Sequence, residues 1–143
     1  MGTFGAAWAT MGVALGFHVI DEAATDFLAS YNPIAARIRS HLRGIPFPPV
    51  FTFWPWFLSL LAAVTILLSL TPLAYAHVAW MVPVAIVVSL INIGNGLLHI
   101  VASIRVRRRV PGVISAPFLL ASGIWLLYAA LHVTSETPMP HLD

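Results

Sequence analysis

The 143-residue sequence contains no cysteine and no lysine, and only 8% of its residues are charged. The lack of cysteine excludes disulfides, thiolate metal sites and cysteine nucleophiles. Water-soluble domains carry about 25% charged residues, so the scarcity of charge excludes an ordinary soluble surface. Seven arginines supply all of the fixed positive charge. They form a few clusters and not a broad basic surface, so we expect no nucleic-acid partner.

What the sequence has instead is apolar: 59% of its residues are hydrophobic, and the mean hydropathy is +0.91. A helix that crosses the hydrocarbon core needs about 20 predominantly apolar residues. Four segments qualify, and they predict an all-α fold, a bundle of four transmembrane helices in a single integral membrane domain over 1–143. The N-terminus has no basic region before its apolar run, so we expect no cleaved signal peptide. The predicted spans are about 3–28, 53–70, 79–104 and 114–134.

The arginines predict the orientation of the bundle, because all seven lie in the first and third connections. An even number of spans puts these two connections on one side, and the positive-inside rule makes that side cytoplasmic. We therefore expect both termini outside (N-out/C-out) and the inner (plasma) membrane of a bacterium. In the first connection, Ile34, Ile38 and Leu42 recur at helical spacing with arginines between them. This pattern predicts a short amphipathic helix on the membrane surface.

Ionisable and polar residues gather at one end of two predicted spans. His18, Asp21 and Glu22 follow an uncharged run of about seventeen residues, whereas Asn95 and His99 lie just before the arginines of the third connection. Both spans run from outside to inside, so both groups lie near the cytoplasmic interface. Because residues three and four apart share one face of a helix, each span presents a polar stripe.

Two small residues of the third span, Gly94 and Gly96, allow another helix to approach closely. We therefore predict that the first and third spans are in contact, with their polar stripes facing each other. Asn92 extends the stripe of the third span by one turn.

Histidine and carboxylate together suit a divalent ion such as zinc, iron or manganese. The sequence predicts a metal site built from His18, Glu22 and His99, with Asp21 as a further ligand or as the carboxylate that orients an imidazole. Such an ion lowers the pKa of a water that it binds, so that a nearby carboxylate, Asp21 or Glu22, can act as general base. Asn95 is placed to donate a hydrogen bond to that water or to a substrate.

Other interpretations of the same residues remain open. His18 can bond a backbone carbonyl while Asp21 and Glu22 are solvated at the helix end, and the asparagines can join helices without any catalytic role. His18 and His99 can be the axial ligands of a haem or pigment. The polar stripe can also serve a proton or ion path, or the chain can be a small non-catalytic subunit. Four helices bury little area, so we expect a homodimer or a larger membrane complex.

The sequence resembles a family of small membrane proteins named for its HXXEE motif. The resemblance rests on His18-Val19-Ile20-Asp21-Glu22 and, further along, on 95–100 and 111–116, Asn-Gly-Leu-Leu-His-Ile and Pro-Gly-Val-Ile-Ser-Ala. Asp21 departs from the motif, which has Glu at this position. The resemblance supports the site and implies no particular activity. We predict a metal-dependent hydrolase or isomerase that acts on a lipid-like substrate from the inner leaflet.

Overall fold

The computed structural model describes residues 3–42 and 45–135, with only the backbone of residues 134 and 135. The described residues form helices and no strands, which confirms the all-α prediction. Four helical segments are long and apolar enough to cross a membrane. Residues 43 and 44, which belong to the first connection, and residues 136–143 of the C-terminal tail lie outside the described residues. The helices are α1 (Thr3–Ala24), α2 (Phe27–His41), α3 (Phe53–Ser69), α4 (Thr71–Tyr75), α5 (Met81–Val106) and α6 (Ala116–Ser135).

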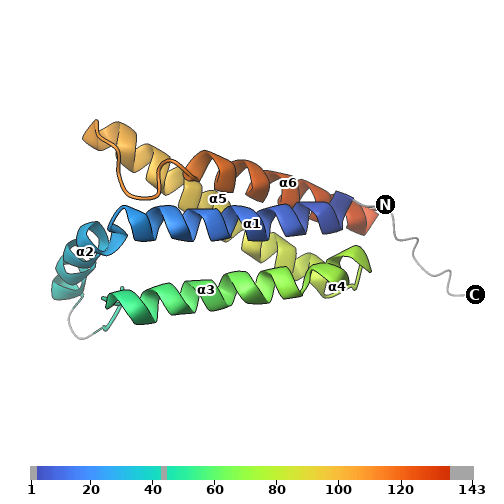
Figure 1. Cartoon of the computed structure of the whole chain (residues 1–143), viewed down its shortest axis with the longest axis horizontal. Coiled ribbons are helices and arrows are strands. Elements are labelled where there is room, and N and C mark those ends of the chain that lie inside the picture. The colour runs from blue at the N-terminus through green and yellow to red at the C-terminus, as the bar shows by residue number, and fades with distance from the viewer. Residues whose placement is uncertain (1–2, 43–44, 136–143) are drawn as a thin grey trace, which may run out of the picture.

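Helix α1 is the centre of the bundle (Figure 1). It packs against α6 on one side and against α3 and α4 on the other, whereas α5 packs along α6. Gly96 permits the close approach of α5 and α6, because a Cβ at this position would lie 3.0 Å from the carbonyl oxygen of Ala116. The predicted contact between the first and third spans is confirmed at the end that holds the polar residues, where His18 and Glu22 of α1 contact side chains of α5. Helices α1 and α5 also both pack on α6.

The core lies where α1, α5 and α6 meet, away from the end that holds the polar residues. Large side chains of α1, namely Phe4, Trp8 and Met11, fill the space between smaller residues of the facing helices. Interdigitation of large and small side chains gives native packing density. The Trp8 indole also donates a hydrogen bond of 2.7 Å to the carbonyl of Leu67, which ties α1 to α3.

Helix α3 is the least buried of the candidate spans. Only Trp56 and Val64 are buried within it, and its remaining leucine and isoleucine side chains are largely exposed. Exposure of so long an apolar face to water would be unfavourable, whereas lipid tails are as apolar as these side chains. The surface of α3 therefore matches a membrane environment.

The first helix is shorter than predicted. It ends at Ala24 and not near Leu28, and Asp26 adopts a left-handed backbone conformation with φ 55° before α2 begins. Aspartate is one of the few residues that tolerate this conformation. The hydroxyl of Thr25 donates to the carbonyl of Asp21 at 2.5 Å, and such side-chain bonds compete with continuation of a helix.

A helix occupies the first connection, as the spacing of Ile34, Ile38 and Leu42 indicates, and these three side chains are exposed. Its position on a membrane surface stays a prediction. The amide of Asn32 both accepts from the backbone N–H of Phe51 and donates to its carbonyl. This pair of bonds joins α2 to the residues before α3. The α2 segment and the loop between α5 and α6 lie at the same end of the bundle (Figure 1).

Candidate metal centre

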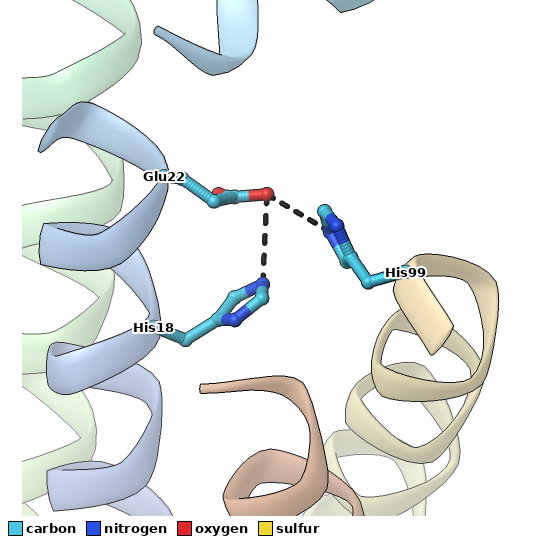
Figure 2. Close-up of side chains that lie close together, drawn as sticks. All are labelled: His18, Glu22 and His99. Atoms are coloured by element: carbon cyan, nitrogen blue, oxygen red, sulfur yellow. Dashed lines mark ion pairs between the residues drawn. The ribbon is translucent and has the colours of Figure 1, made fainter. Parts of the chain in front are cut away.

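Three side chains from two helices converge at the end of the bundle where α2 begins. His18 and Glu22 are one helical turn apart on α1, and His99 comes from α5 (Figure 2). One oxygen of Glu22, Oε1, lies 3.5 Å from Nε2 of His18 and 3.1 Å from Nε2 of His99. The three potential ligand atoms all lie within 4.8 Å of one another. The structure thus brings together the residues that the sequence predicts as ligands.

These side chains are shielded from the surroundings. The exposed fractions of His18, Glu22 and His99 are 1%, 5% and 8%. Burial of a carboxylate is costly unless a cation or several hydrogen bonds compensate it. Glu22 has no arginine partner among the described residues, so its compensation must come from the two imidazoles or from an ion that they share.

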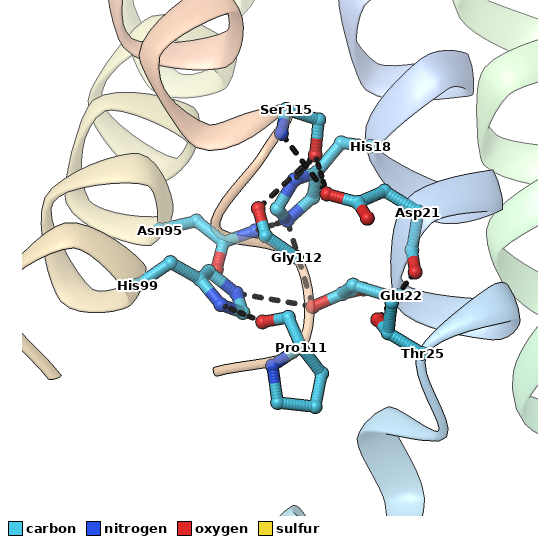
Figure 3. Close-up of polar contacts among 9 residues, drawn as sticks. All are labelled: His18, Asp21, Glu22, Thr25, Asn95, His99, Pro111, Gly112 and Ser115. Carbon is cyan, nitrogen blue, oxygen red and sulfur yellow. Dashed lines mark hydrogen bonds and ion pairs between the residues drawn. The ribbon is translucent and has the colours of Figure 1, made fainter. Parts of the chain in front are cut away.

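The tautomer of His18 follows from its contact with Ser115. Nδ1 of His18 lies 2.8 Å from the Ser115 hydroxyl. That hydroxyl has a single proton, which it donates to Oδ2 of Asp21 at 2.8 Å or to the carbonyl of Gly112 at 3.1 Å. Both of these partners only accept, so the hydroxyl accepts from His18. His18 therefore carries its proton on Nδ1, which leaves the lone pair of Nε2 directed at Glu22 (Figure 3).

The tautomer of His99 is fixed by a backbone carbonyl. Nδ1 of His99 lies 2.6 Å from the carbonyl oxygen of Pro111, which can only accept. Nδ1 is thus the donor, and Nε2 faces Glu22. The amide of Asn95 lies 3.2 Å from Nε2 of His18, and an amide N–H there also requires an unprotonated Nε2. All of these contacts agree on the same pair of tautomers.

With both imidazoles neutral, these contacts direct three electron-pair donors at one small volume. Two neutral imidazole nitrogens and a carboxylate oxygen repel one another unless a proton or a metal ion lies among them. Ligands of a tetrahedral zinc ion, at bonds of 2.0–2.1 Å, lie roughly 3.4 Å apart. The two separations from Glu22, 3.5 and 3.1 Å, are close to that value. The donor set and its spacing fit a divalent ion with three protein ligands, the pattern that leaves further coordination positions open.

Asp21 lies beside this cluster and does not point into it. Its Oδ2 accepts bonds from the backbone N–H and the hydroxyl of Ser115, at 2.9 and 2.8 Å. Asp21 thus contacts Ser115, which in turn contacts His18, and it is not one of the three clustered ligand residues. Adjacent helical residues are about 100° apart, so Asp21 and Glu22 cannot face the same point. The contact of Ser115 with His18 was not predicted from the sequence, since a lone serine before an apolar span carries no periodic signal.

Gly112 closes the cluster on the side of the α5–α6 loop. Its φ is +78°, a conformation that side chains disfavour. A Cβ on this residue would lie 2.9 Å from Cε1 of His99, 3.0 Å from Cγ of Glu22 and 3.0 Å from Cε1 of His18. Only glycine allows the loop to take this course and to lie so near all three side chains.

Aromatic rings cover the cluster on the side of α2 and α3. The ring of Phe27 lies 5.9 Å from that of His99 and stacks at 5.8 Å on Trp56. The rings of His18 and His99 themselves meet edge to face, with centroids 4.9 Å apart. With Gly112 packed against both imidazoles, this arrangement leaves no space for a macrocycle between them. The residues present do not fit the haem interpretation.

The other predicted candidates have separate positions. Asn92 donates to the carbonyl of Val88 on its own helix and does not reach the cluster. His41 and His132 each contact a carbonyl one turn earlier in their own helices. Among the described residues, His18, Glu22 and His99 are the one group of three with metal-ligating spacing.

Comparison with known families agrees with the motif at the centre of this site. A family model described as "Protein of unknown function with HXXEE motif" matches residues 9–126. Comparisons with curated proteins and with solved structures give no match. The matched region contains all three candidate ligands together with Gly112 and Ser115. The chain belongs to the HXXEE family.

Proposed function

We propose that this HXXEE-family protein is a metal-dependent membrane enzyme whose ion is held by His18, Glu22 and His99. One observation carries the proposal: both imidazoles donate from Nδ1 to other partners, so that in their neutral form two Nε2 lone pairs and a carboxylate oxygen meet. Three ligands from side chains, with positions left open, are typical of catalytic sites and not of structural ones. Zinc, iron and manganese all accept this ligand set.

The ion would polarise a carbonyl or phosphoryl oxygen and lower the pKa of a bound water. The chain's own residues supply the rest. Asn95 can turn its amide toward a reacting oxygen, because its present partner is the Nε2 of His18 that would bind the ion. Oε2 of Glu22 makes no hydrogen bond with any described residue, so it is available to accept a proton. Asp21 and Ser115 hold His18 in the tautomer that the ion needs.

The location of the site supports a lipid-like substrate. The cluster lies toward the ends of two of the four candidate spans, α1 and α5, and these ends lie on the same side of the bundle as α2 and the α5–α6 loop, which carry the arginines (Figure 1). The positive-inside rule assigns that end to the cytoplasmic side. A substrate that reaches this depth from the inner leaflet brings a head group to the ion while its chain stays in the hydrocarbon. We infer hydrolysis or rearrangement of such an amphiphile.

Elemental analysis of detergent-purified protein tests the metal site directly. We compare the wild type with His99→Ala and with His132→Ala, whose histidine lies outside the cluster on α6. The expected result is near-stoichiometric zinc, iron or manganese in the wild type and in His132→Ala, and loss of the metal in His99→Ala. Wild-type protein that stays metal-free after dialysis against each ion would overturn the proposal and favour an ion-paired proton path.

The enzymatic step has a separate test. Wild-type protein and Glu22→Gln are incubated with a total lipid extract, and the lipids are compared by mass spectrometry. A product formed by the wild type and absent with Glu22→Gln supports the reaction. Equal lipid profiles, with metal bound to the wild type, would leave a metal site without the proposed activity.

A further inference from the structure

A pocket lies beside the metal centre, at the α5–α6 loop. Its volume is about 280 Å³, and it lies where the end of α1 meets the α5–α6 loop. Two of its residues carry opposite charges, and the other five offer a hydroxyl or apolar surface. The lining residues are Asp21, Thr25, Arg109, Val110, Pro111, Val113 and Ile114.

The two charged residues do not pair with each other. No ion pair within 4.0 Å joins Asp21 to Arg109, and the Arg109 guanidinium makes no hydrogen bond with any residue in the described ranges. Asp21 uses Oδ2 for Ser115, and its Oδ1 has no partner among the described residues. Opposite charges that share a pocket without contact are complementary to a ligand that itself carries both signs.

We propose that this pocket binds the head group of a zwitterionic phospholipid with a primary ammonium. The phosphate lies against Arg109, which presents a fork of donors suited to phosphate oxygens. The ammonium lies against Oδ1 of Asp21, the acidic residue of the same lining.

The lining distinguishes a primary ammonium from a quaternary one. Sites for quaternary ammonium groups are built from aromatic faces, and this pocket contains no aromatic ring. It offers oxygen acceptors instead: the Asp21 carboxylate and the Thr25 hydroxyl, whose own proton is donated to a backbone carbonyl. Oxygen acceptors match the three N–H donors of a primary ammonium.

The apolar lining explains why the ligand is a lipid and not a soluble phosphate ester. Val110, Val113 and Ile114 form the wall of the pocket beside the charged pair, and the side chain of Ile114 is 62% exposed. An exposed isoleucine at the rim of a charged pocket continues the apolar surface along which an acyl chain would lie. The volume suits a head group and not a whole lipid.

This site is independent of the proposed metal chemistry, although the two share a wall. Pro111 lines the pocket, and its carbonyl accepts a hydrogen bond from His99. Asp21 lines the pocket and also holds Ser115. A bound head group would therefore support the loop that positions the candidate ligands, from its outer face.

Native mass spectrometry of delipidated protein tests the inference. Dioleoyl phospholipids with ethanolamine, choline and glycerol head groups are titrated separately, so that only the head group differs. The ethanolamine lipid is expected to bind about tenfold more tightly than the other two, from its additional charge-assisted hydrogen bonds. Arg109→Gln should lower its retention about tenfold. Arg108→Gln, a neighbouring arginine outside the pocket lining, should leave it unchanged.

Several outcomes would overturn the assignment. If the glycerol lipid binds as tightly as the ethanolamine lipid, Asp21 does not recognise an ammonium. If Arg108→Gln and Arg109→Gln lower retention of the ethanolamine lipid equally, binding depends on the general positive charge of this segment and not on the pocket. Competition by soluble phosphoethanolamine at the same concentration excludes a lipid as the ligand. Size-exclusion elution of both variants confirms their fold. Metal content measured on the same samples separates this result from the proposed function, since lipid selectivity in metal-free protein would leave this inference standing alone.

Discussion

The substitution Gly112→Ala tests the packing of the α5–α6 loop against the candidate ligands. A residue with a Cβ in the left-handed conformation costs about 1–2 kcal/mol, and Gly112 has φ +78°. The added methyl group would also lie 2.9–3.0 Å from carbon atoms of His99, Glu22 and His18. Overpacking of this kind costs about 1–3 kcal/mol. We therefore expect the free energy of unfolding to fall by roughly 2–5 kcal/mol.

The same substitution should weaken metal binding, because relief of the contacts displaces the ligands themselves. Changes in the residues that orient metal ligands typically cost about 10–100-fold in affinity. Gly94→Ala is the matched control: nothing lies within 4 Å of its Cβ position, and the residue is inside α5. Alanine in a helix interior is about 1 kcal/mol more favourable than glycine, so this variant should gain stability and keep its metal.

Unfolding in detergent followed by circular dichroism gives the stability difference, and competition with a chelating indicator gives the metal affinity. The two alanine variants should move in opposite directions in the first assay and differ by about 10–100-fold in the second. The reasoning would be refuted if Gly112→Ala unfolded like the wild type and bound metal with the same affinity. In that case the loop does not lie against the imidazoles as described.

Two further substitutions test other contacts of the structure. Ser115→Ala removes the hydroxyl between Asp21 and His18 and should lower metal affinity about 10–100-fold. The control Ser122→Ala removes a buried hydroxyl of α6 outside the cluster and should leave metal affinity unchanged. Equal metal affinities of the two variants in the indicator assay would contradict the role of Ser115. Trp8→Phe removes the hydrogen bond to Leu67 that ties α1 to α3. It should lower the free energy of unfolding by about 0.6 kcal/mol, the average for such bonds in membrane proteins. A decrease well above about 2 kcal/mol would show that the indole stabilises the protein by more than this hydrogen bond.

Part of this structure follows from the sequence on simple grounds. The length of the apolar runs predicts four spans, and their bounds agree within a few residues with α3, α5 and α6. The meeting of His18, Glu22 and His99 also follows, because topology sets their depth and the helical period sets their facing. Both arguments use regular geometry, which depends little on tertiary detail.

The rest of the site could not be predicted, because it belongs to an irregular loop. No periodicity fixes the course of residues 107–115, so the carbonyl of Pro111 and the hydroxyl of Ser115 were missed as partners of the imidazoles. Small residues permit the close approach of another helix but do not determine which helix it is. Gly96 packs against α6 and not against α1. The break after Ala24 depends on a single left-handed residue, Asp26, which composition does not reveal.

The bonds around the cluster join positions that emerge from the ribosome far apart in time. Ser115 follows His18 by 97 positions, and Asn95 follows it by 77. When the first span enters the membrane, His18 and Glu22 have only each other, and a two-ligand set holds a divalent ion poorly. Under the proposed function, an ion is retained only after α5, which carries His99, has docked and the α5–α6 loop has closed over the cluster. Metal loading would then mark the completion of biogenesis, and half-inserted chains would remain empty.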